Sequence, residues 1–105
     1  MIRVSVLDPQ QAGAQFDWSY YLEKHVPLVQ RLLGGAMKSI SIEQGVGGGA
    51  PESPAPYVAI ADLTFESVAA YLAEFGPHAE EILADLSKFT SITPTVQVSE
   101  IRVEA

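Results

Sequence analysis

The segment "YVAIADLTF", residues 57–65, constrains the fold of this chain most strongly. It has the length and the β-branched and aromatic content of a strand. Both of its alternating faces are apolar, with Val58 and Ile60 on one face and Ala59, Ala61 and Leu63 on the other. A strand of this kind is covered on both sides of its sheet. The fold must therefore provide a cover for each face.

Three more strands and two helical regions surround this segment. Alternation in "MIRVSVL" predicts a strand over residues 1–7, followed by a loop, and further strands are expected over 36–44 and within 93–105. Apolar residues at helical spacing predict one helix beginning near Asp17 and another after Thr64, the second interrupted at Gly76 and Pro77. The order βαββαβ is typical of an α+β, ferredoxin-like fold, in which a four-stranded antiparallel sheet carries both helices on one face.

That arrangement leaves the other face of the sheet bare. A second copy of the same sheet is the simplest cover, so we expect a homodimer packed sheet to sheet, a dimeric α+β barrel. The interior of such a barrel can hold a small ligand, and we expect the binding chamber there. With 105 residues, the chain has room for one domain spanning 1–105.

The stretch "YYLEKHVPLVQRLL", residues 20–33, contains the first candidate site residue. His25 lies on the apolar stripe of the predicted helix, where a buried structural histidine and a pocket residue are both reasonable interpretations. Pro27 cannot donate a hydrogen bond to the carbonyl of Glu23, so we expect the helix to kink or split there. The kink would turn His25 toward a pocket, where an imidazole can act as acid, base or hydrogen-bond donor.

His78, in "FGPHAEE", is the second candidate, either solvated or lining the same pocket. Asp85 could orient a histidine, although the sequence slightly favours a surface position. The second helix is expected to bury an inner stripe, and several aromatic residues could line the pocket. The stripe consists of Val68, Tyr71, Leu72 and Phe75, and the aromatic residues are Trp18, Tyr21, Tyr71 and Phe89.

Composition excludes several function classes. The net charge is −7 and the six basic residues form no patch in the sequence, which argues against nucleic acid and anionic membrane surfaces as partners. The chain has no cysteine, no signal peptide pattern and no apolar run long enough to span a membrane, so a cytoplasmic location is expected. Nucleotide-binding motifs and closely spaced histidines are absent, so we expect no tightly bound cofactor and no metal.

"FDWSYYLEKHVPLV" and the stretch from "YVAIADLTF" through "FGPHAEEILADLSKFTSITPTVQVSEI" resemble the EthD family, whose name comes from ethyl tert-butyl ether degradation. The resemblance covers nearly the whole chain except the loop 45–56. It implies a dimeric α+β barrel, and His25 and His78 match histidines of the family pattern. It also implies an oxidoreductase label, and relatives of the same barrel include cofactor-free monooxygenases, lactone isomerases and cyclases.

Three functions are therefore open at this point. The first is an oxidoreductase acting on a small apolar or aromatic compound, with His25 as base or donor and His78 as its partner. The second is cofactor-free acid–base chemistry by the same residues, such as isomerisation, cyclisation or decarboxylation. The third is a non-catalytic accessory protein that binds a hydrophobic intermediate of a degradation pathway.

Overall fold

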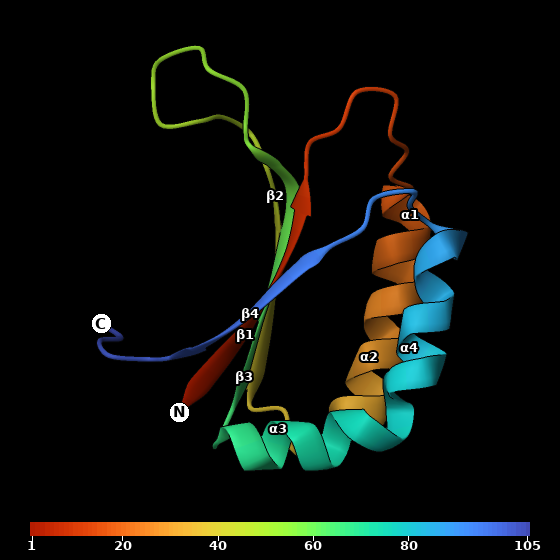
Figure 1. Ribbon diagram of the computed structural model, residues 1–105, viewed down its shortest axis with the longest axis vertical. Coiled ribbons are helices and arrows are strands. Elements are labelled where there is room, and N and C mark those ends of the chain that lie inside the picture. Colours follow the sequence, from red (N-terminus) through yellow and green to blue (C-terminus); the bar gives the residue numbers. More distant parts are fainter.

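Four antiparallel strands form one sheet in the computed structural model, which describes residues 1–105. In sequence order they are β1 (Ile2–Pro9), β2 (Ser39–Gln44), β3 (Tyr57–Phe65) and β4 (Thr95–Glu100). In the sheet their order is β2-β3-β1-β4, and the helices all lie on one face (Figure 1). The predicted α+β ferredoxin-like fold is confirmed, although β2 begins three residues later than expected.

The first helical region runs without interruption but changes its winding. It consists of α1 (Trp18–Tyr20), a π-helical turn (Tyr21–His25) and α2 (Val26–Leu33). Asp17 caps its start, as predicted, by accepting a hydrogen bond of 3.1 Å from the Tyr20 backbone N–H. Within the π-helical turn the Val26 N–H reaches back five residues to the Tyr21 carbonyl. Pro27 follows at the start of α2, so a widened turn takes the place of the expected kink.

The second helical region bends around one end of the sheet. α3 (Val68–Phe75) crosses that end, a 3₁₀ turn (Gly76–His78) changes direction, and α4 (Ala79–Asp85) then runs back along the sheet before a last 3₁₀ turn (Leu86–Lys88) (Figure 1). Because only one side of α3 meets the sheet, Tyr71 and Phe75 pack against the core. Val68 and Leu72, predicted to be buried, are exposed. None of the helices combines the length and the apolar character needed to cross a membrane.

The helix-facing side of the sheet forms the core. The pairing register of β1 with β3 aligns Val4 with Leu63 and Ile2 with Phe65, which places their side chains on this face. α2 covers them with Val29 and Leu33. The buried cluster comprises Ile2, Val4, Val29, Leu33, Ala61, Leu63, Phe65 and Ile82.

The helix-free side of the sheet is partly apolar and partly polar. Leu7 and Ile60 pair at one end of this face. Farther along, Ser5 donates a hydrogen bond of 2.7 Å to Asp62, and the hydroxyls of Ser39 and Thr64 lie 2.5 Å apart. The expectation that both faces of β3 are uniformly apolar is therefore only half right, because Asp62 and Thr64 satisfy their polar groups within the sheet.

Leu33 offers a direct test of the core, because it is almost completely buried in the cluster. Leu33→Ala should lower the free energy of unfolding by about 3 kcal/mol, through lost burial and the cavity left behind. Val46→Ala, at a position that is 98% exposed, should change it by less than about 0.5 kcal/mol. Urea unfolding followed by circular dichroism measures both; equal effects of the two substitutions would contradict this packing.

Candidate active site

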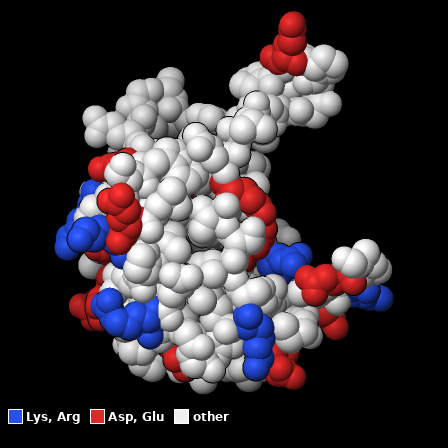
Figure 2. All heavy atoms as spheres, turned by 180° about the vertical axis from the view of Figure 1, so that it is seen from behind, with Lys and Arg blue, Asp and Glu red and all other residues white.

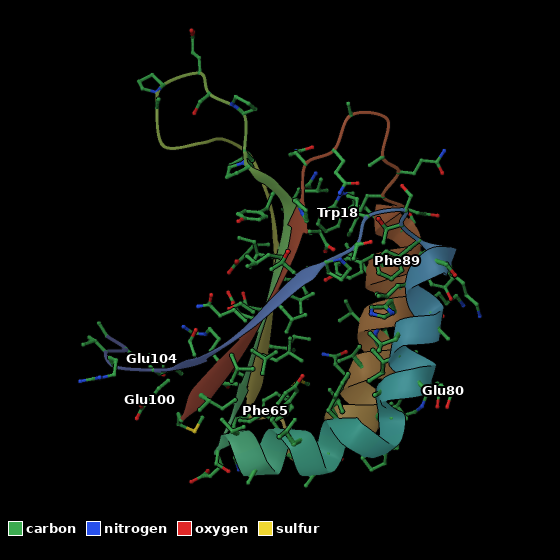
Figure 3. All side chains as sticks on the ribbon, viewed as in Figure 1. Trp18, Phe65, Glu80, Phe89, Glu100 and Glu104 are labelled. Carbon is green, nitrogen blue, oxygen red and sulfur yellow. The ribbon has the colours of Figure 1, made fainter.

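A cavity of about 120 Å³ lies between the sheet and the helices of one chain. Of its 20 lining residues, 17 are hydrophobic, and they come from all four strands and both helical regions. Figure 3 shows side chains of the two layers pointing toward one another across this space. Leu83 on α4 and Val96 on β4 are the lining residues that are more than half exposed, so the mouth opens between these elements.

This position differs from the one expected from the sequence. The chamber was predicted between the bare sheets of two copies, but the cavity lies on the opposite, helix-facing side of the sheet. The reason is that the helices do not pack flat on the sheet near β4. Val96 and Val98 of that strand remain exposed as a result. All the lining residues come from one chain.

Four titratable side chains line the cavity: Asp8, Tyr21, His25 and Tyr71. Asp8 comes from β1, Tyr21 and His25 come from the π-helical turn, and Tyr71 comes from α3. Polar groups that converge on an otherwise apolar cavity are the usual composition of a ligand or active site.

His25 is held in the cavity wall by Asp85. The residue is 6% exposed, and its Nδ1 lies 2.9 Å from Oδ2 of Asp85, which is 8% exposed. The rings of Tyr21 and Phe89 pack against the imidazole, with centroids 5.9 Å and 4.7 Å away, and against each other. The hydrogen bond to Asp85 and this aromatic packing fix the orientation of the ring.

Asp85 receives further support from the outer side of the helices. Tyr20 donates a hydrogen bond of 2.8 Å to its Oδ1, and Lys88 Nζ lies 3.7 Å from the same oxygen. Burial opposes the ionisation of Asp85, but hydrogen bonds from His25 and Tyr20 and the charges of His25 and Lys88 outweigh it and lower its pKa. The same hydrogen bond, followed by burial and the charge of Asp85, raises the pKa of Tyr20.

This arrangement determines which nitrogen of His25 is available. An ionised Asp85 can only accept, so Nδ1 carries the hydrogen and the neutral ring has its lone pair on Nε2. Nε2 has no hydrogen-bond partner, yet protein atoms do not enclose it completely. It is therefore an unused base on a residue that lines the cavity.

Asp8 is the second polar feature of the cavity. It lies near the end of β1, is 5% exposed, and its carboxyl group takes part in no hydrogen bond or ion pair within the chain. Burial raises its pKa from 3.8 to about 6. The pKa of the Tyr21 hydroxyl is also raised, by burial first and then by the negative charge of Asp8.

The structure brings some of the predicted site residues to the cavity and leaves others outside it. His25, Tyr21, Tyr71 and Phe89 line it. Trp18 lies behind Tyr21, with ring centroids 5.6 Å apart, and Figure 3 places it at the same end of the molecule as Phe89.

His78 lies in the 3₁₀ turn between α3 and α4 and does not line the cavity. The turn redirects the chain, so the predicted pairing of its imidazole with His25 has no basis in the geometry. The surface position favoured for Asp85 is wrong, because the packing of α4 against the first helical region buries that carboxylate against His25.

Asp8 was missed because it was assigned to the loop that follows the first strand. β1 in fact extends to Pro9. Simple alternation from Val4 and Val6 would have placed Asp8 on the helix-facing side, and a carboxylate on an apolar face is an informative signal.

The basic residues are also less scattered than the sequence suggested. Lys24, Arg31 and Lys88 line one groove on the outer side of the helices, together with Tyr20, Glu81 and Asp85. On the face shown in Figure 2 the basic groups remain separated from one another, and uncharged atoms surround a hollow near the middle. No group of three or more histidine and acidic side chains is close enough to hold a metal ion.

Comparison with protein families identifies the chain. The model of the EthD domain matches residues 10–93. The chain belongs to the EthD family. The resemblance drawn from the sequence motifs is thereby confirmed. A comparison with curated proteins found no match.

Solved structures agree with this assignment. An EthD-like protein from Ralstonia eutropha JMP134 is 36% identical, with 99% of this chain and 94% of that chain covered and a TM-score of 0.92. A hydroxynitrile lyase from Passiflora edulis is 19% identical, with 99% and 95% covered and a TM-score of 0.69. A dimeric ferredoxin-like protein from an uncultured marine organism is 13% identical, with 100% and 98% covered and a TM-score of 0.56. The last two show a shared fold.

The raised pKa of Asp8 makes stability depend on pH. Asp8 binds its proton more tightly in the folded protein, so its contribution to stability is present below pH 4 and is lost as the pH rises to about 6. Asp8→Asn should therefore increase the free energy of unfolding by about 1–2 kcal/mol at pH 8, after allowance for solvent screening, and change it little at pH 4.

Urea unfolding at the two pH values measures this difference. Glu43→Gln, on the exposed edge strand β2, is the matched control and should show no such pH dependence. A destabilised Asp8→Asn protein at pH 8 would contradict the environment described for Asp8.

Proposed function

We propose that this EthD-family protein is an enzyme that removes a proton from a small, largely apolar molecule, with Nε2 of His25 as the base. The observation that carries the proposal is the buried hydrogen bond between His25 and Asp85 beside the apolar cavity. The carboxylate fixes the tautomer and stabilises the imidazolium that forms when His25 takes up a proton. Asp85 acts through His25 and is a positioning residue.

The volume and the apolar lining of the cavity limit which substrates can bind. A volume of about 120 Å³ is close to that of cavities that bind one aromatic ring, and the apolar lining excludes molecules that carry several charges. Larger substrates can extend through the mouth between Leu83 and Val96. Tyr21, Tyr71 and Phe89 supply aromatic surface for the bound ring.

Oxidation is the second candidate, and it rests on the oxidoreductase label that the family resemblance implies. Proton removal from a phenol or quinol by His25 would be its first step, and dioxygen would then be the oxidant. Conversion that persists under nitrogen supports acid–base chemistry, whereas conversion that requires air supports oxidation. Tight ligand binding without conversion under either atmosphere supports the accessory-protein alternative instead.

His25→Gln tests the proposal on compounds with one ring, such as phenols, quinols, cyclic ketones and lactones. For any compound that the wild type converts, the rate should fall by about 10²–10⁴, because glutamine keeps a polar side chain but cannot accept the proton. His78→Gln should remain close to wild type, because that residue lies away from the cavity. Liquid chromatography of the products measures both. A His25→Gln protein with the wild-type rate would rule out His25 as the base.

We also infer that two copies associate through their helix-free sheet faces. The apolar pair Leu7 and Ile60 on this face supports the inference, and a dimeric ferredoxin-like protein shares the fold. A charge placed among these residues should oppose association. Ile60→Asp should yield monomers in sedimentation velocity, whereas Glu52→Asp, in the loop between β2 and β3, should sediment as the wild type does. A monomeric wild type would contradict the inference.

A further inference from the structure

The carboxyl group of Asp8 has no structural partner to explain its burial. A buried acid usually forms an ion pair or accepts hydrogen bonds, but the Asp8 side chain does neither within the chain. Its oxygens keep some accessible surface, and the residue lines the cavity. A group left unpaired in this way can interact with a ligand that enters the cavity.

Asp8 and His25 belong to facing layers. Asp8 comes from β1 in the sheet, and His25 comes from the π-helical turn that covers it. Both residues line the same cavity of about 120 Å³, and Tyr21 connects them: its hydroxyl is close enough to Asp8 to be affected by its charge, and its ring stacks on His25 with centroids 5.9 Å apart. The other titratable groups that face the cavity are the hydroxyls of Tyr21 and Tyr71. The lining residues contributed by β2, β3, α4 and β4 are apolar.

We propose that Asp8 is a second catalytic residue, the acid that protonates a carbonyl oxygen while His25 removes the hydrogen from the adjacent carbon. This inference rests on the proposed function and adds a substrate class to it. The substrate would be a small ketone, aldehyde or lactone with an α-hydrogen. The cavity would then catalyse its conversion to the enol.

The step balances without any further reactant. The α C–H bond breaks, its proton goes to Nε2 of His25, and its electron pair forms the carbon–carbon double bond. The electrons of the carbonyl π bond take the proton of Asp8 and form the enol O–H bond. While the proton is on His25 it can be replaced by one from solvent. Delivery of that solvent-derived proton to the same carbon, with return of the enol O–H proton to Asp8, then gives exchange and restores both residues.

The surroundings of Asp8 and His25 suit their roles as acid and base. Burial favours the neutral, proton-carrying form of Asp8, and its raised pKa of about 6 places a usable fraction of that form near neutral pH. Hydrogen bonds and nearby positive charge keep Asp85 ionised, so it can stabilise the imidazolium of His25. Two carboxylates of one site are thus held in different protonation states, as acid–base catalysis requires.

The experiment measures exchange of α-hydrogens for deuterium in acetone and cyclohexanone by proton NMR in D2O. Wild-type protein should accelerate exchange over buffer alone. Asp8→Asn should reduce the protein-catalysed rate by about 10²-fold, because an amide can donate a hydrogen bond but cannot transfer the proton. His25→Gln should reduce it at least as much, and Glu43→Gln should leave it unchanged.

The pH profile tests the direction of transfer. The ratio of wild-type to Asp8→Asn rate should be largest below pH 6 and should fall about tenfold per pH unit above it, because only the protonated carboxyl acts. A ratio that rises with pH would make Asp8 a base and overturn the assignment. Carbon-13 NMR should also show the Asp8 carboxyl signal shifting when cyclohexanone binds.

The outcomes separate this inference from the function on which it rests. An unchanged rate in Asp8→Asn together with a lost rate in His25→Gln overturns the role of Asp8 and leaves His25 as the base. An unchanged rate in His25→Gln overturns both. A wild type that exchanges neither probe faster than buffer overturns the carbonyl substrate class, while conversion of phenols or quinols that depends on His25 would still support the proposed function.

Discussion

The hydrogen bond between His25 and Asp85 is the contact on which the site depends. It joins the π-helical turn to α4, two segments separated by 60 residues in the sequence. An isolated carboxylate at this depth would be unfavourable, and the donors His25, Tyr20 and Lys88 around Asp85 compensate for its burial. The bond also leaves the imidazole with one free nitrogen and a fixed orientation. The same hydrogen bond thus links the two helical regions and prepares His25 to act as a base.

The π-helical turn explains how the first helical region can present His25 at all. Proline has no N–H to donate within a regular helix, and the wider turn that precedes Pro27 accommodates this loss. π-helical turns occur often at functional sites because they shift side chains relative to the regular helix. In this chain the turn places Tyr21 and His25 in the cavity wall, whereas Tyr20, the last residue of α1, lies on the outer side, where it meets Asp85.

The sequence predicted the fold well because its apolar periodicities are strong and local. Alternation and helical spacing were enough to define four strands, two helical regions and their order. The cavity was harder to predict, because it depends on how far the helices stand from β4. The exposure of Val96 and Leu83, which marks its mouth, has no counterpart in periodicity.

The positions of single residues were predicted less well, because they too depend on how distant elements pack. His25 could be placed on a face from local spacing, but its partner Asp85 required knowledge of how two distant helices pack. Asp8 was not recognised as a site residue because the predicted first strand ended two residues before the observed one. His78 lies where a turn redirects the chain, and no local pattern specifies the direction that follows.

Nitrogen-15 NMR of the His25 imidazole can determine whether its Nε2 is free to meet a ligand in the cavity. The neutral ring should carry its hydrogen on Nδ1, and a ligand that fills the cavity, such as phenol, should shift the Nε2 signal. A neutral ring with its hydrogen on Nε2, or an Nε2 signal that does not respond to the ligand, would contradict the proposed role of His25.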